Sequence, residues 1–207
     1  MTFCPCPVLR RALALSLVVA AAAAVQPRAA EAQVSTTRGW SFGAHLVGAS
    51  LTVEDEDADG GGGLGLRAGY GFNRTVTAFL SVDGIAFDAD NAPDEVQGDW
   101  TMAHVDLGAR FHLANALRRW VPWLEAAVGA RTVSLDSEEE EDVSFTGGSF
   151  TVGGGLDVYL RQTFALELGL RFTGGEFTDV EVGNVTVEGL DLDATSVRVG
   201  LGVTWWP

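Results

Sequence analysis

Apolar side chains alternate with polar or small ones in the stretch Phe164-Ala165-Leu166-Glu167-Leu168-Gly169-Leu170-Arg171-Phe172. Successive side chains of a β-strand point to opposite faces, so the stretch predicts a strand with one apolar face. The other face carries Glu167, Gly169 and Arg171. The nine residues match the length of a tilted strand that crosses a lipid bilayer. Alternation alone fits both a soluble sandwich and a membrane barrel.

Seven further segments show the same alternation with period two, and we find no convincing helical stretch after residue 32. These segments are residues 40–52, 62–72, 75–87, 100–113, 122–135, 150–160 and 195–206. Together with residues 164–172 they predict an all-β fold, an eight-stranded antiparallel up-and-down barrel formed by one domain, residues 33–207.

The first 32 residues show the three parts of a secretory signal peptide. Arg10-Arg11 precedes the apolar run 12–25, and Ala30-Glu31-Ala32 supplies a cleavage site. The run holds 14 residues. A membrane-spanning helix needs roughly 20, which disfavours a transmembrane anchor. Both cysteines precede the run, so the mature chain is expected to contain no disulfide and no thiolate metal site.

The polar face of the predicted strands has the composition of a closed interior. It is rich in glycine, which relieves crowding inside a narrow barrel, and it contains no lysine. Its charges nearly balance, as burial requires, because an unpaired buried charge costs several kcal/mol. We predict an interior charge network made of Arg67, Asp83, Asp106, Arg110, Glu125, Arg131, Asp157, Arg161, Glu167, Arg171 and Arg198.

The predicted connections alternate between short and long. Residues 73–74, 114–121 and 161–163 form the short connections, and residues 53–61, 88–99, 136–149 and 174–194 form the long ones. Membrane barrels have short periplasmic turns, long external loops and, with an even strand number, both termini in the periplasm. The connections therefore favour a transmembrane barrel over a soluble β-domain.

Charge is distributed unevenly along the predicted barrel axis. Residues 33–207 hold 10 arginines, no lysine and 27 acids, and this net charge of −17 argues against a nucleic-acid partner. The four long connections contain 22 of the acids and no arginine. The arginines outside the predicted interior lie at the opposite end: Arg38, Arg74, Arg118 and Arg119. Solvation of the loops is the simpler interpretation of such acidic runs.

Cation binding is the alternative interpretation of the acidic connections. Asp55, Asp57 and Asp59 followed by Gly60 match the first half of a calcium loop, in which alternate carboxylates converge on the ion. Position 12 of such a loop falls on Leu66, which cannot coordinate a metal. We therefore expect no tightly held cofactor. Weakly bound Ca²⁺ or Mg²⁺ could bridge the acidic loops to anionic lipopolysaccharide.

Residues 153–160, the hairpin continuing through 164–172 and the closing strand resemble the outer-membrane β-barrel family that includes the small OmpA- and OmpX-type barrels. The resemblance covers all of the mature chain. It implies a monomer in the bacterial outer membrane that contacts lipid and lipopolysaccharide, with a C-terminal strand recognised by the barrel assembly machinery. Pro207 follows Trp205-Trp206, which departs from the terminal aromatic residue usual in the family.

The sequence gives little support for a catalytic function or for transport through the barrel. His45, His104 and His112 are predicted to point inward, and no Gly-x-Ser-x-Gly motif or metal-spaced histidine pair occurs, which disfavours a lipid A-modifying enzyme. An eight-stranded barrel is just wide enough for side chains to fill it. We expect a non-catalytic envelope-structural or adhesion-type barrel that displays acidic extracellular loops. A narrow porin-like ion channel is the alternative.

Overall fold

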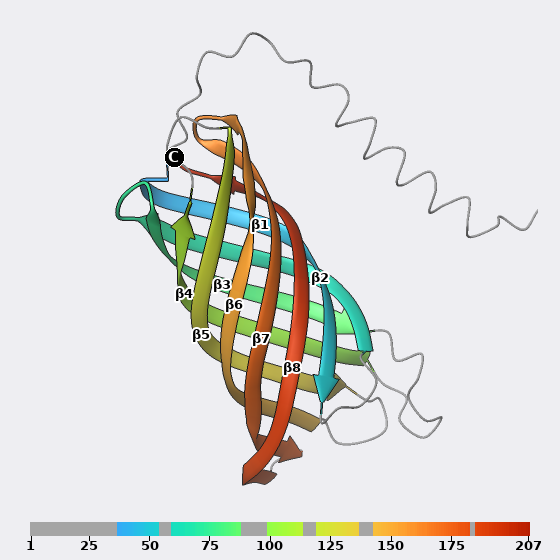
Figure 1. The fold of residues 1–207 in the computed structure, drawn as a ribbon. Helices are drawn as coiled ribbons and strands as arrows, with labels where there is room; N and C mark the ends of the chain where they lie inside the picture. The colour runs from blue at the N-terminus through green and yellow to red at the C-terminus, as the bar shows by residue number, and fades with distance from the viewer. Residues whose placement is uncertain (1–36, 54–58, 88–98, 114–118, 137–142, 183–184) are drawn as a thin grey trace, which may run out of the picture. The chain divides into compact units, whose positions relative to one another are not determined.

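Eight antiparallel strands form the structure, a computed structural model that describes residues 37–53, 59–87, 99–113, 119–136, 143–182 and 185–207. The strands are β1 (Gly39–Val53), β2 (Asp59–Gly71), β3 (Val76–Phe87), β4 (Asp99–His112), β5 (Trp120–Asp136), β6 (Val143–Arg161), β7 (Phe164–Val182) and β8 (Val185–Trp205). Each pairs with the next, and β8 pairs with β1, so the sheet closes into a barrel (Figure 1). The predicted fold class is confirmed. The predicted signal peptide lies outside the described residues.

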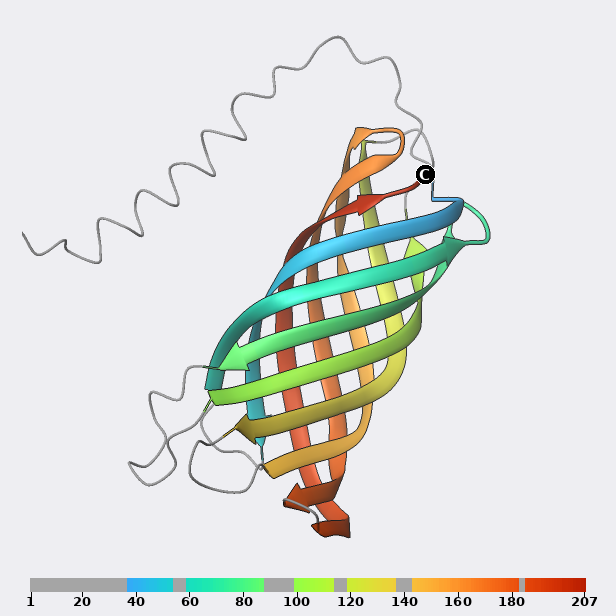
Figure 2. The same cartoon turned by 180° about the vertical axis from the view of Figure 1, so that it is seen from behind.

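The two ends of the barrel differ in their connections. Residues 72–75, 113–119 and 162–163 join strands at one end, which we call the turn end, and the C-terminus lies there too (Figure 1). The opposite end, which we call the loop end, receives the connections 54–58, 88–98, 137–142 and 183–184. Viewed from behind, the inclined strands continue around the barrel without a gap (Figure 2).

The apolar face of the strands points outward. On β7, Leu168 is 53% exposed whereas its neighbour Glu167 is 6% exposed. The same contrast recurs around the barrel, where the exposed large side chains include Leu46, Leu64, Leu107, Leu124 and Leu201. A soluble sandwich would bury these side chains, so the arrangement is that of a barrel surrounded by lipid. Among the described residues, no helix is long and apolar enough to cross a membrane.

Three strands extend much further toward the loop end than the sequence predicts. β6 begins at Val143, β7 continues to Val182 and β8 begins at Val185, so most of the predicted loops 136–149 and 174–194 are strand. Both figures of the ribbon show β7 and β8 reaching past the other strands (Figures 1 and 2). The prediction was wrong here because apolar-outward alternation stops at Phe172, although the backbone pairing does not.

The inside–outside pattern reverses along the extended strands. Beyond Phe172, which is 48% exposed, the outward positions of β7 are Gly174, Glu176 and Thr178, and the inward Phe177 is 3% exposed. A barrel with a polar outside and an apolar inside is stable in water and not in lipid. The outward-facing apolar band from Phe164 to Phe172 covers nine residues, which span about 20–25 Å of membrane for a tilted strand.

Candidate functional site

Ten of the eleven predicted interior charges lie buried inside the barrel. None of them is more than 9% exposed: Arg67, Asp83, Asp106, Arg110, Glu125, Arg131, Asp157, Glu167, Arg171 and Arg198. Arg161 is the exception, because it is exposed at the turn end of β6. An irregular pairing between Tyr159 and Arg161 breaks the alternation on which its prediction rested. The interior therefore holds five acids and five arginines, with no formal excess of charge.

Two glutamates and three arginines form one cluster, which we call the Glu125 cluster: Arg67, Arg110, Glu125, Glu167 and Arg171. Arg67 donates to both Glu125 oxygens, at 3.1 and 3.3 Å. Arg110 donates to Glu125 Oε2 at 2.8 Å and to Glu167 Oε2 at 2.7 Å. Arg171 donates to Glu125 Oε1 at 2.6 Å. These charge-assisted bonds come from strands around the whole barrel, so they tie its walls together.

Trp123, which was not among the predicted interior residues, completes the Glu125 cluster. The Arg110 guanidinium carbon lies 3.8 Å from the centre of the Trp123 ring, in cation–π geometry, and Trp123 is 1% exposed. The ring has room because its neighbours on β6 and β7 are Gly155 and Gly169. Strand alternation could have predicted this position from the sequence. Because Leu124 points outward, its neighbour Trp123 must point inward, where it lies opposite Gly155.

Arg198 organises a second cluster nearer the loop end, which we call the Arg198 cluster. Its guanidinium donates to Asp83 on β3, to Asp106 Oδ2 at 2.9 Å on β4 and to Thr173 Oγ1 at 2.9 Å on β7. His45 Nε2 lies 2.9 Å from the other Asp83 oxygen. Asp83 and Asp106 thus share Arg198, Asp83 alone also contacts His45, and the side chain of Arg198 is completely buried.

Arg131 lies apart from both clusters. It is 1% exposed, donates one bond to the carbonyl of Ala194 at 3.1 Å and lies over the ring of Phe177. Within the described part of the chain it forms no ion pair within 4.0 Å. His104, its partner across β4 and β5, is fully buried and has no hydrogen bond to a described residue.

Apolar side chains close the interior at both ends. Eight buried residues pack together toward the loop end: Val47, Ala49, Ile85, Phe87, Met102, Val133, Phe177 and Ala194. Val121, Tyr159, Ala165 and Trp206 pack at the turn end, and the rings of Tyr159 and Trp206 stack at 5.5 Å. In the described structure, the charged clusters therefore lie between two apolar layers.

One internal arrangement has the order of a catalytic triad. Thr77 Oγ1 lies 3.3 Å from His112 Nε2, and His112 Nδ1 lies 3.8 Å from Asp157 Oδ2. A working triad needs a hydrogen bond at each step and an accessible hydroxyl. The second distance is too long for a hydrogen bond, and Thr77 is 5% exposed while His112 is 3% exposed. As predicted, all three histidines point inward.

Only one of the three predicted calcium ligands lies in the part of the chain that the structure describes. Asp55 and Asp57 lie outside the described residues, and Asp59 enters the structure as the first residue of β2, opposite Leu51. The described residues contain no group of three or more histidine, cysteine or acidic side chains arranged to hold a metal. Weak cation binding by the acidic connections stays a prediction.

The sequence matches the family model of the outer membrane protein beta-barrel domain over residues 12–204. The chain belongs to the outer-membrane β-barrel family. The protein is therefore located in the bacterial outer membrane. In barrels of this kind, the short turns face the periplasm and the opposite strand ends face outward. None of the curated proteins compared matches the sequence.

Solved structures of other outer-membrane barrels share the fold. Neisserial surface protein A is 17% identical with a TM-score of 0.63, and the alignment covers 81% of this chain and 96% of that one. The attachment invasion locus protein Ail of Yersinia pestis is 14% identical with a TM-score of 0.52, covering 82% of this chain and 100% of Ail. Ail has also been solved in complex with the heparin analogue sucrose octasulfate. These low identities show a common fold and no more.

Proposed function

We propose that this outer-membrane barrel is a non-catalytic surface protein, envelope-structural or adhesion-type, that displays acidic strand ends and loops outside the cell. The observation that carries the proposal is the closed interior. Eight of the ten buried charges form the Glu125 and Arg198 clusters between two apolar layers, which argues against a water-filled path for ions and against an accessible site for a substrate among the described residues. The surface that remains for a partner is the exposed loop end.

The reversed part of the barrel supports display of that surface. Glu176 on β7 pairs with Asp193 on β8, and both side chains are exposed. Two acidic side chains directly opposite each other on paired strands repel, and this repulsion lowers the stability of the folded barrel. Such a pair lowers its energy when a cation or a basic partner approaches. Weak Ca²⁺ or Mg²⁺ bridging to lipopolysaccharide, or adhesion to a basic surface, would use this same chemistry.

Conductance in planar bilayers tests the proposal against the narrow ion channel. We expect the folded protein to be electrically silent, because ions would have to cross both apolar layers and break the Glu125 cluster. A large-pore outer-membrane porin in the same bilayer serves as the positive control. A steady, reproducible open channel from the native protein would contradict the closed interior and favour the channel function.

Intact cells that display the protein test the adhesion part. We expect them to bind a cationic surface such as immobilised polylysine more than cells without the protein do, and not to gain binding to heparin. Neutralising Glu176 and Asp193 to glutamine and asparagine should reduce the difference. Equal adhesion with and without the protein would leave only the envelope-structural role.

A further inference from the structure

Four exposed arginines among the described residues surround the turn end of the barrel. Arg38 precedes β1, Arg74 lies in the turn between β2 and β3, Arg119 precedes β5, and Arg161 ends β6. The described residues thus place one guanidinium before β1, one in the turn after β2, one directly before β5 and one at the end of β6. We call this set the arginine rim. Because the residues lie at the ends of different strands, they are distributed around the barrel mouth.

The arginine rim has no counter-charge among the described residues. The acids nearest the turn end, Glu125, Asp157 and Glu167, are buried in the interior, where they face other arginines. None of the four rim arginines forms an ion pair within the described structure. Glu176 and Asp193, the exposed described acids, lie at the loop end. Four like charges at one mouth are therefore left to an external anion.

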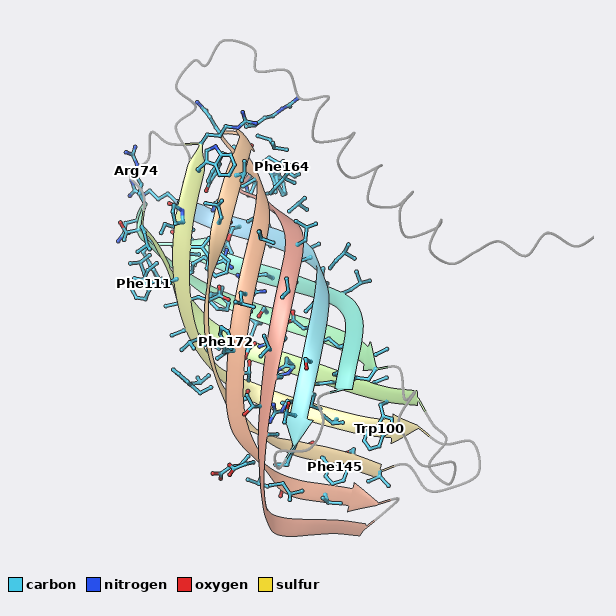
Figure 3. The ribbon with its side chains drawn as sticks, turned by 45° about the vertical axis from the view of Figure 1, so that its right-hand side comes forward. Arg74, Trp100, Phe111, Phe145, Phe164 and Phe172 are labelled. Carbon is cyan, nitrogen blue, oxygen red and sulfur yellow. The ribbon has the colours of Figure 1, made fainter. Side chains whose placement is uncertain are left out.

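Aromatic side chains lie directly beside the arginine rim. Three of these aromatic side chains are more than half exposed: Trp40 (59%), Phe72 (60%) and Trp120 (58%). Each lies within two residues of a rim arginine in the sequence. Figure 3 shows Arg74, Phe111 and Phe164 at this end, whereas Trp100 and Phe145 lie at the other. Exposed aromatic rings mark the depth of the membrane–water interface in barrels. The guanidinium groups one or two residues away therefore reach the depth of the lipid headgroups.

We propose that the arginine rim is a binding surface for anionic phospholipid headgroups of the periplasmic leaflet. Guanidinium groups bind phosphate through paired, planar hydrogen bonds, and basic side chains next to a membrane attract anionic lipid. A lipid accounts for the ring-shaped distribution and for the adjoining aromatic belt. A soluble anionic partner would explain the charge but not the belt.

Tryptophan quenching by brominated lipids tests the proposal. The full mature chain is folded into vesicles of phosphatidylcholine that contain either brominated phosphatidylglycerol or brominated phosphatidylcholine at equal mole fraction. Trp40, Trp120 and Trp205 are exposed beside the arginine rim and report on nearby lipid. We expect stronger quenching by the anionic lipid, with a preference that grows by roughly fivefold per engaged arginine at low salt and falls as salt is added.

Two variants make the result decisive. Changing the four rim arginines to glutamine is expected to abolish the preference, whereas changing them to lysine keeps the charge and should retain most of it. Heat-modifiable gel migration checks that both variants fold. Equal quenching by the two lipids in the native protein, or an unchanged preference in the glutamine variant, overturns the proposal. The native protein could also show no lipid preference but cosediment with peptidoglycan, and the glutamine variant could lose that cosedimentation. This result would assign the arginine rim to a different anion and overturn the lipid proposal as well.

Discussion

Gly169 on β7 shows how tightly one residue can constrain the interior. A Cβ atom at this position would lie 2.9 Å from Cη2 and 3.0 Å from Cζ2 of Trp123, closer than ordinary carbon contacts. We expect Gly169→Ala to lower the free energy of unfolding by about 1–3 kcal/mol, as overpacking does. Urea titration of the protein in lipid vesicles measures the change.

The chain offers a matched control on the same strand. Gly174 on β7 is exposed, and a Cβ there would meet no atom within 4 Å, so Gly174→Ala should change stability by no more than about 0.5 kcal/mol. Phenylalanine lacks the two indole atoms that the added methyl group of Gly169→Ala would contact. In a Trp123→Phe background the penalty of Gly169→Ala should therefore shrink. An undiminished penalty would show that the indole ring is not its cause.

Arg161 and Arg171 have the same side chain but different surroundings. Arg171 is 2% exposed and pairs with Glu125 and Glu167, whereas Arg161 is exposed. Removing one partner of a buried ion pair typically costs about 3–5 kcal/mol, so Arg171→Gln should destabilise the barrel by that order. Arg161→Gln should stay within about 0.5 kcal/mol. Similar losses for both in the same titration would place Arg161 in the interior after all.

At the scale of elements, the long β7–β8 hairpin extends past the lipid-facing band. Phe177 on β7 pairs with Leu192 on β8, and both pack in or against the loop-end apolar layer. Replacing residues 178–191 with Asn-Gly, a favoured two-residue hairpin turn, should leave the barrel folded, because the band and both apolar layers are retained. Heat-modifiable migration on a detergent gel checks this. Loss of the compact, unboiled band would show that the distal hairpin is required for folding.

The sequence predicted the elements where one pattern held and failed where the pattern changed. Residues 164–172 alternate cleanly, and their strand begins as expected at Phe164. The extension of β7 to Val182 was missed because its apolar side chains turn inward once the strand leaves the lipid. Arg161 was misplaced because alternation cannot reveal an irregular pairing, which depends on the partner strand. Trp123 could have been placed by parity, but its contact with Arg110 depends on three-dimensional packing.

For the molecule as a whole, charge is sorted into three zones. The five acids and five arginines of the interior balance, the arginine rim lies at the turn end, and the exposed acids Glu176 and Asp193 lie at the loop end. A neutral interior avoids the cost of burying excess charge. The two mouths carry opposite charge, so each suits the partner on its own side of the membrane.

Arg198 has a consequence for the order of events during folding. It lies on β8, the last strand of the chain, yet its partners Asp83 and Asp106 lie on β3 and β4, separated from it by 115 and 92 residues in sequence. Until β8 arrives, these carboxylates lack their cation, and an incomplete barrel would hold uncompensated charge in a lipid environment. We therefore expect closure to be cooperative, because a seven-stranded intermediate would leave Asp83 and Asp106 without Arg198.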